Sequence, residues 1–163
     1  MLVIVDMQNR ILETDDENYV PGADKIIPKI LQRLTKARKS GEMVLFTRDI
    51  PIEHKNESEE RIELQIVDEL APLPEEYVFK KNYYALPPEK LLDVRALTEK
   101  RKQEKSRIEV VGVELSICVL ANTLALQSAL PEGDFYIDSE LVAGNKLNET
   151  ALQLLEQFNV EIE

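Results

Sequence analysis

The sequence predicts an α/β fold, a three-layer α/β/α sandwich with a mostly parallel six-stranded sheet, and three observations support this class. Short apolar runs that suit strands alternate along the chain with longer stretches of helical periodicity. The run at residues 2–5 is apolar at every position, which is typical of parallel strands covered on both faces. We find no internal repeat, linker or low-complexity tract, so residues 1–163 are expected to form one domain.

The strands and helices are expected in a regular order. Strands are predicted at residues 2–5, 43–46, 77–79, 108–113, 134–137 and 160–162. Helices are predicted from residue 22 to the stop at Gly41, and at 88–105, 117–130 and 148–158. Ser116 and Asn148 are candidate N-caps of the last two helices. The long connection at 50–76 is expected to be a lid, a binding loop or disordered, with one short helix inside it.

Composition excludes some partners and compartments. The chain has 31 acidic against 20 basic residues and a net charge of -11, which opposes binding to nucleic acid or to an anionic membrane. A small-molecule partner is unaffected by this argument, because a local site can differ in sign from the whole protein. One cysteine forms no internal disulfide, no apolar run approaches the length of a membrane span, and the N-terminus resembles a strand rather than a signal peptide. We therefore expect a cytoplasmic protein.

The strongest chemical signal is the stretch around the only cysteine, Cys118. The strand at 108–113 is followed by a sharp turn from Gly112 to Ser116 and then by the helix at 117–130. This order places Cys118 in the first helical turn, where free backbone N–H groups and the helix dipole favour a nucleophilic thiolate. A buried, purely hydrophobic cysteine is the alternative, since its neighbours in the sequence are apolar.

Two further reactive groups occupy equivalent positions. Asp6 and Lys80, like Cys118, follow directly on predicted strands. A parallel sheet brings such residues to the same edge, so the three are expected to meet there. Asp6 would move the thiol proton, Lys80 would hold negative charge and lower the pKa of the cysteine, and Cys118 would attack a carbonyl carbon. Lys80 alone could equally be a surface lysine at a strand end, and the adjacent Lys81 makes the choice between the two ambiguous.

With these residues in place, the chain resembles the isochorismatase-like cysteine hydrolase family, which includes nicotinamidases and other small amidases. The matching motifs are Asp6-Met-Gln-Asn9, Thr47-Arg-Asp49, Lys80-x-x-Tyr83-x-Ala85 and Gly112-Val-Glu-x-x-x-Cys118-Val119. The resemblance implies a triad of Asp6, Lys80 and Cys118, and the spacing to Tyr83 selects Lys80 over Lys81. It also implies a cis peptide before Glu114, with the N–H groups of Glu114 and Cys118 forming an oxyanion hole.

The chain departs from the nicotinamidase pattern where that pattern binds a divalent metal. Nicotinamidases have an Asp-x-His motif and a further His, whereas here Asp49 is followed by Ile50 and Pro51, and His54 is the only histidine. A partial site from Asp49, His54 and Glu60 is a weak candidate, so we expect no metal and no cofactor.

The residues near the expected pocket also differ from the family pattern. The substrate pocket is assigned to Asn9, Tyr83, Tyr84 and Leu86, and the last two stand where the family usually has a serine and an aromatic residue. The specificity is therefore expected to differ from that of the named enzymes.

The sequence leaves three functions open. The first is a cysteine hydrolase that cleaves the C–N bond of a small amide through a thioester at Cys118. The second is an isochorismatase-type enol-ether hydrolase, in which Asp6 is the general acid and the cysteine is dispensable. The third is a catalytically silent protein that binds a small molecule on the same scaffold. The resemblance also implies a homo-oligomer, with the helix after Pro87 as a candidate contact.

Overall fold

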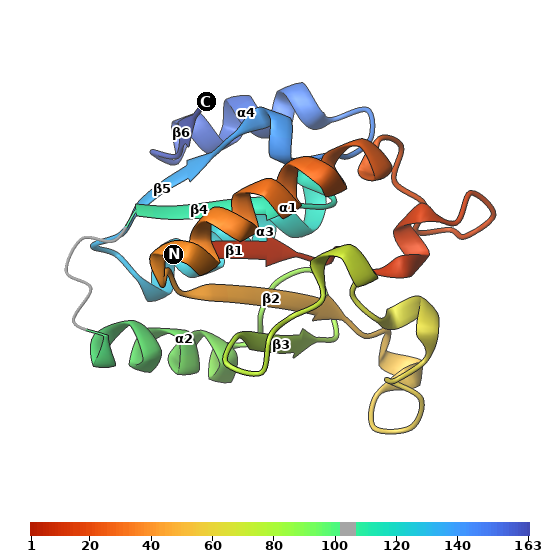
Figure 1. Cartoon of the computed structure of the whole chain (residues 1–163). Helices are drawn as coiled ribbons and strands as arrows, with labels where there is room; N and C mark the ends of the chain where they lie inside the picture. The colour runs from red at the N-terminus through yellow and green to blue at the C-terminus, as the bar shows by residue number, and fades with distance from the viewer. Residues whose placement is uncertain (102–106) are drawn as a thin grey trace.

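The computed structural model describes residues 1–101 and 107–163, and its centre is a six-stranded parallel sheet (Figure 1). The strands are β1 Leu2–Val5, β2 Val44–Asp49, β3 Tyr77–Lys81, β4 Arg107–Gly112, β5 Asp134–Ile137 and β6 Glu161–Ile162. Their order across the sheet is β3-β2-β1-β4-β5-β6, and every pair of neighbours is parallel. With helices on both faces, this confirms the predicted fold class.

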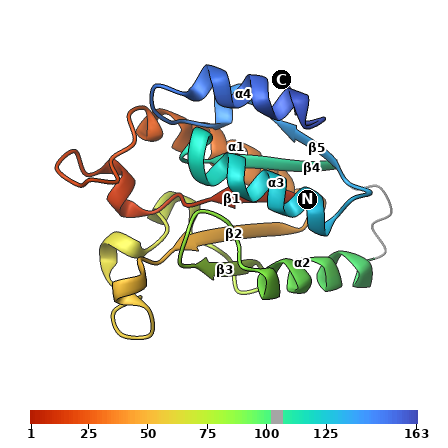
Figure 2. The same cartoon turned by 180° about the vertical axis from the view of Figure 1, so that it is seen from behind.

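Four α-helices cover the two faces of the sheet. They are α1 Ala23–Ser40, α2 Pro88–Lys100, α3 Leu120–Ala129 and α4 Asn148–Gln157. In the two opposite views α1 lies on one face and α3 on the other, with α2 and α4 flanking α3 (Figures 1 and 2). The core divides in the same way. Buried apolar residues of α1 pack with one side of β1, β2 and β4, and those of α2, α3 and α4 pack with the other side.

The starts of α3 and α4 differ from the predicted ones. Ser116 is not an N-cap, because a turn of π-helix, Leu115–Val119, precedes α3 and contains it. The Glu114 carbonyl accepts hydrogen bonds from the N–H groups of Ile117 and Val119, so the chain enters the helix two residues earlier than expected. Asn148 is the first residue of α4 rather than its cap. The predicted extension of α2 toward residue 105 falls on 102–106, outside the described residues.

The connection at 50–76 is attached to the rest of the fold more firmly than the predicted lid would be. In place of one short helix it has three 3₁₀ turns, Ile52–His54, Ile62–Leu64 and Asp68–Leu70. Its second half is anchored, since Val67 N–H donates to the Met7 carbonyl. Leu64 and Leu70 are buried. The loop therefore forms a fixed wall beside the carboxyl end of β1.

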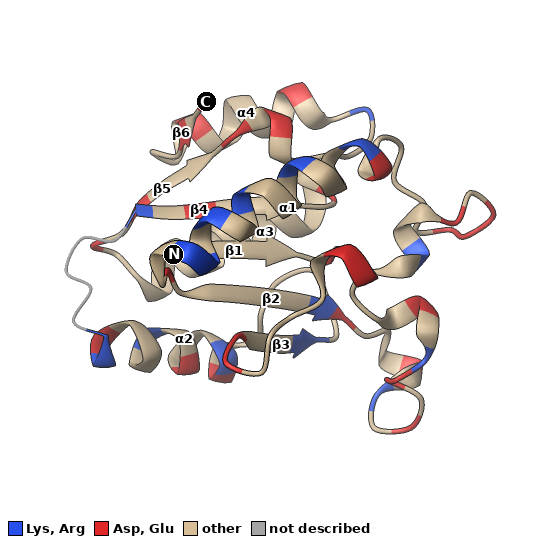
Figure 3. Cartoon of the chain, in the orientation of Figure 1, with Lys and Arg blue, Asp and Glu red and all other residues tan. Residues whose placement is uncertain are grey.

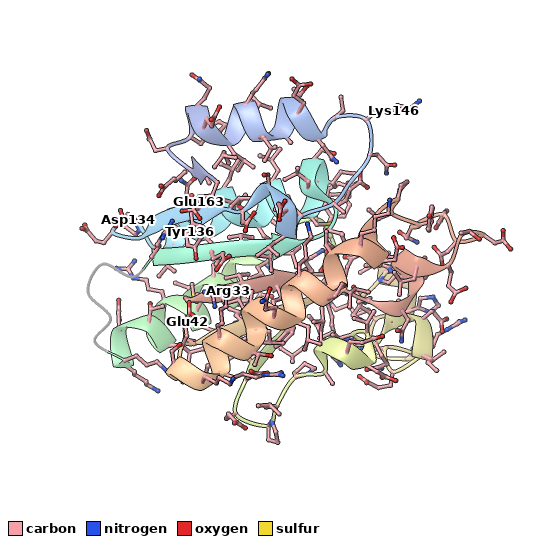
Figure 4. All side chains as sticks on the ribbon, turned by 45° about the horizontal axis from the view of Figure 1, so that its top comes forward. Arg33, Glu42, Asp134, Tyr136, Lys146 and Glu163 are labelled. Carbon is pink, nitrogen blue, oxygen red and sulfur yellow. The ribbon has the colours of Figure 1, made fainter. Side chains whose placement is uncertain are left out.

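A partly buried charge cluster fixes α1 against the sheet. Arg33 of α1 forms ion pairs with Glu109 of β4 and with Glu42, and Tyr136 Oη of β5 donates to Glu109 Oε2 at 2.6 Å. Figure 4 shows Arg33 lying between Glu42 and Tyr136. Because a buried carboxylate is costly unless it is paired and hydrogen-bonded, the Glu109 contacts are what make that residue tolerable within a strand.

This cluster predicts a loss of stability in alkali. Burial and the hydrogen bond to Glu109 raise the pKa of Tyr136 to about 12 from an ordinary value of 10. A group whose pKa is higher in the folded state contributes stability below its unfolded pKa and loses it as the pH rises through the folded pKa. We therefore expect the free energy of unfolding to fall between pH 10 and 12, and to fall less steeply in Tyr136→Phe. Urea denaturation across this range checks the expectation, and identical slopes for the two proteins would contradict it.

None of the helices within the described part of the chain has the length and apolar character required to cross a lipid bilayer.

Candidate active site

The candidate site lies where the direction of strand order reverses. From β1 the chain continues to β2 and β3 on one side, then crosses to β4 and β5 on the other. Asp6 follows β1 and Cys118 follows β4, so both lie at the carboxyl ends of neighbouring strands, the usual place for sites in open α/β sheets. Asp6 has a left-handed backbone with φ of 51°, an uncommon conformation that is most often found in turns and at functional sites.

The lysine at this point is Lys81. Its Nζ lies 2.8 Å from Asp6 Oδ2, 3.1 Å from Asp49 Oδ1 and 3.6 Å from Cys118 Sγ. The ammonium also donates to the Tyr83 carbonyl at 2.9 Å. The Lys81 side chain has no exposed surface. An acid, an amine and a sulfur from three separate parts of the chain therefore meet as the sequence predicted, with a different lysine.

The prediction of Lys80 is wrong. Its side chain is 41% exposed, and its Nζ is bound by Glu59 at 2.7 Å and Glu60 at 2.8 Å on the surface. The hydrogen bonds that its ammonium donates to these two carboxylates raise the pKa of Lys80. A group held there has no contact with Cys118, so Lys80 is removed from the candidate site.

The physical reason is the alternation of side chains along a strand. β3 includes both lysines, and Tyr77, Phe79 and Lys81 point to the same side, toward α2 and α3. Val78 and Lys80 point to the other side. Counting in steps of two from the apolar Tyr77 and Phe79 would have selected Lys81 from the sequence.

Thr47 is a neighbour of Asp6 whose role the sequence did not reveal. Its Oγ1 donates to Asp6 Oδ1 at 2.6 Å and accepts from the Asp6 N–H at 3.2 Å. These bonds occupy one carboxylate oxygen and turn the other toward Lys81.

The peptide between Val113 and Glu114, shortly before Cys118 in the chain, is cis. The carbonyl of Ala143 accepts from the next N–H, that of Leu115.

The segment that follows Lys81 is fixed by Asn122 of α3, a residue whose role the sequence did not reveal. The Asn122 amide is fully buried. It donates to the carbonyls of Tyr84 and Cys118 and accepts from the N–H of Leu86. The Tyr83–Tyr84 segment is thereby held beside the turn that carries the sulfur.

The four predicted pocket residues differ in where the structure places them. Tyr83 and Tyr84 are 72% and 49% exposed, with ring centroids 4.4 Å apart, so both are available at the surface near Cys118. Leu86 belongs to the core between the sheet and α2 and α3, which corrects its assignment to the pocket. Asn9 donates to the Ile62 carbonyl at 2.8 Å and so anchors the 62–65 segment.

The resting thiol is not the low-pKa group that the sequence suggested. Burial and the nearby carboxylate of Asp6 together raise the pKa of Cys118 to about 12, and the opposing effect of Lys81 only partly offsets them. Lys81 itself stays protonated, because Asp6, Cys118 and Asp49 raise its pKa against the opposing effect of burial. The sulfur is therefore a thiol at neutral pH, and a base is needed to ionise it.

This state predicts a distinctive alkylation profile. The rate of Cys118 modification by iodoacetamide should rise about tenfold per pH unit from pH 7 to 10, because the thiolate fraction grows at that rate below the pKa. Peptide mass spectrometry after timed quenching measures the rate. A plateau near neutral pH would show a low-pKa thiolate and contradict the assignment.

The three weak metal candidates each contact different side chains. Asp49 is paired with Arg10 and Lys81. His54 Nδ1 is hydrogen-bonded to Ser58 Oγ at 2.7 Å, and Glu60 is bound to Lys80. The structure does not bring them together as a ligand set.

One family model covers nearly the whole chain. Residues 1–158 match the family model described as the isochorismatase domain. The chain belongs to the isochorismatase family. This confirms the resemblance seen in the sequence. The search of curated proteins gave no match.

Solved structures share the fold across nearly the whole chain. A pyrazinamidase of Pyrococcus horikoshii in complex with zinc is 23% identical, with a TM-score of 0.79 and coverage of 99% of this chain and 97% of that chain. A nicotinamidase from Staphylococcus aureus is 19% identical, with a TM-score of 0.80 and coverage of 99% and 96%. A cysteine hydrolase from Pseudomonas syringae pv. phaseolicola is 17% identical, with a TM-score of 0.82 and coverage of 99% and 86%. These neighbours are hydrolases.

Because the pyrazinamidase was solved with zinc, we tested whether this chain fits a divalent metal. Zinc is held by three or four His, Cys, Asp or Glu donors. No group of three such side chains is placed to hold a metal within residues 1–101 and 107–163. Asp49, one of the weak metal candidates from the sequence, already contacts two cationic side chains through its two carboxylate oxygens. The side chains of the described residues therefore do not provide the donors that a divalent metal needs.

Proposed function

We propose that this chain is a cysteine amidase that hydrolyses the C–N bond of a small amide through a thioester at Cys118. The observation that carries the proposal is the single ammonium of Lys81, which contacts Asp6 at 2.8 Å and Cys118 at 3.6 Å. An acid–base group and a nucleophile are thereby held beside one buried cation, and covalent acyl transfer uses a nucleophile paired with such an acid–base group.

Each residue has a role in a balanced sequence of steps. The Cys118 sulfur bonds to the carbonyl carbon while the thiol proton passes to Asp6, which the raised pKa of the thiol makes necessary. The tetrahedral intermediate breaks its C–N bond, and the amine leaves with the proton from Asp6. Water then attacks the thioester with Asp6 as base. The C–S bond then breaks, the carboxylic acid departs, and the proton that Asp6 took from water returns to the sulfur.

The developing negative charge needs fixed donors. We assign the oxyanion hole to the backbone N–H groups of Glu114 and Cys118, which lie on the turn that leads into α3. Each such donor stabilises the transition state by about 3 kcal/mol in comparable sites. Lys81 adds a positive charge beside the sulfur and restrains Asp6. Tyr83 and Tyr84, exposed beside this turn, are the proposed contacts for the rest of the substrate.

A second function is favoured by one observation. Because Cys118 rests as a protonated thiol, a reaction that does not use the sulfur as a nucleophile also fits the site, namely enol-ether hydrolysis with Asp6 as the general acid. The two functions separate in mutants. Amide hydrolysis needs both Cys118 and Asp6, whereas the enol-ether reaction survives Cys118→Ala and is lost in Asp6→Asn.

The experiment is an ammonia-release assay with nicotinamide, pyrazinamide and a series of simple aliphatic and aromatic primary amides. We expect turnover by the wild type and a loss of at least about a thousandfold in Cys118→Ala and Asp6→Asn. Ser128→Ala, a change at an exposed hydroxyl of α3, is the control and should keep full activity. Ligand binding without release of ammonia from any amide would instead support a silent binding protein.

A further inference from the structure

Asp49 is paired with two cationic side chains of this protein, Arg10 and Lys81. Arg10 is 6% exposed, and its Nη2 donates to Asp49 Oδ2 at 2.6 Å. On the other side, Asp49 Oδ1 lies 3.1 Å from Lys81 Nζ. The end of β2 that carries Asp49 is fixed in turn by Gln8, whose side chain bonds both the N–H and the carbonyl of Asp49. One carboxylate thus connects a buried guanidinium to the ammonium that faces Cys118.

We propose that the Arg10 guanidinium takes the place of a metal ion beside Asp49, and that Arg10 positions Lys81 through this carboxylate. The chain is then independent of divalent metal. Arginine suits the role because its planar cation is charged at every physiological pH and is less strongly hydrated than an ammonium. The second part of the proposal rests on the proposed function of Lys81.

The positioning argument is electrostatic. Lys81 faces the carboxylates of Asp6 and Asp49 and the sulfur of Cys118. While Arg10 neutralises Asp49, the ammonium is shared between Asp6 and the sulfur. Without Arg10, the uncompensated charge of Asp49 would draw the ammonium away from the sulfur and would itself oppose ionisation of the thiol. Arg10 is therefore expected to set the reactivity of Cys118 without touching it.

The surroundings of Arg10 make metal binding a demanding test. Arg10 borders a cavity of about 330 Å³ between the segments that follow β1 and β2. Its walls include the acidic side chains of Asp15, Asp16, Glu17, Glu53 and Glu63. Figure 3 shows acidic stretches on both segments. Such walls raise the local concentration of cations, so zinc is attracted to this cavity rather than repelled from it. If zinc still does not displace Arg10 from Asp49, repulsion of the metal is not the reason.

The first experiment is titration calorimetry with zinc alone. We expect the heats of binding to be the same for the wild type and for Asp49→Asn, because Asp49 is not available to a metal. Stoichiometric zinc binding by the wild type that is lost in Asp49→Asn would overturn the proposal.

The second experiment compares two equally buried arginines. Arg48 is also 6% exposed, but it bonds the carbonyls of Leu64 and Glu59 instead of Asp49. At pH 8.5 we expect iodoacetamide to modify Cys118 about tenfold more slowly in Arg10→Ala than in the wild type, because the thiol ionises less readily. Arg48→Ala should stay within about twofold, and Arg10→Lys should recover most of the rate.

Equal slowing in Arg10→Ala and Arg48→Ala would show a merely structural role and overturn the positioning argument. Arg10→Gln, which keeps polarity and most of the side-chain length, replaces Arg10→Ala if that variant does not fold. Neither experiment measures turnover. An amide screen that failed would therefore contradict the proposed function while leaving the zinc and alkylation results to decide on Arg10.

Discussion

Lys81→Met is expected to lower amide turnover by at least about a thousandfold, while Lys80→Met changes it less than about twofold. The two lysines are adjacent, yet only Lys81 contacts Asp6 and Cys118, and Lys80 is held on the surface by Glu59 and Glu60. Loss of the buried ammonium removes the positive charge that stabilises a thiolate during attack. Steady-state assays on the two variants measure the difference.

The same two variants, Lys81→Met and Lys80→Met, are also expected to differ in stability. Lys81→Met leaves the buried Asp6 carboxylate without its cation, which costs about 3 to 5 kcal/mol in comparable buried pairs. Lys80→Met removes only surface ion pairs, which are worth about 1 kcal/mol or less. Urea denaturation measures both, and circular dichroism establishes that the Lys81 variant is folded before its activity is interpreted. Equal losses of activity or of stability in the two variants would contradict the assignment of Lys81.

Gly112→Ala is expected to destabilise the protein by about 3 kcal/mol or more. Gly112 ends β4 directly beside the end of β1 and has φ of +113°. A Cβ there would lie 2.2 Å from the Val5 carbonyl oxygen and 2.9 Å from the Val5 nitrogen. The added methyl would push apart the two strands that carry Asp6 and Cys118, so activity should fall together with stability.

Gly41→Ala is the matched control for backbone conformation. Gly41 also has a positive φ, +67°, but a Cβ there meets nothing within 4 Å. Its substitution carries the cost of a left-handed alanine alone, about 1 to 2 kcal/mol, and should leave the site intact. Chemical denaturation of both variants gives the comparison. A Gly112→Ala protein no less stable than Gly41→Ala would show that the strand ends can separate without cost.

Much of the fold could be predicted because its signals are local. The fully apolar run at Leu2–Val5 and the stripe of Ile26, Ile30 and Leu34 on α1 each reflect burial on a known face, and the structure buries them all. The start of the nucleophile helix was misplaced because a serine before an apolar segment is also compatible with a turn of π-helix.

The site was predictable to the level of strand ends and no further. Parallel strands had to bring Asp6 and Cys118 to one edge, whatever the details of packing. The choice between Lys80 and Lys81 depended on the face of β3, which the alternation of Tyr77 and Phe79 indicates but motif spacing does not. Arg10, Thr47 and Asn122 act through contacts with residues 36 to 41 positions away. Such pairings exist only once the chain is folded.

The raised pKa of Cys118 was also beyond the sequence. The position of the cysteine in a first helical turn favours a thiolate, but burial and the facing carboxylate of Asp6 together outweigh Lys81. The depth of the sulfur and the distances among these groups determine the balance, and no local pattern encodes them.

The most direct measurement is the mass of the Cys118 peptide after acid quenching of a reaction with an amide that the enzyme turns over. The account predicts that this peptide gains the mass of the acyl group as a thioester, that the adduct is removed by hydroxylamine, and that Lys81→Met forms it far more slowly than Lys80→Met. Turnover of the amide at full rate by Cys118→Ala, with no acyl group on the wild-type peptide, would contradict it.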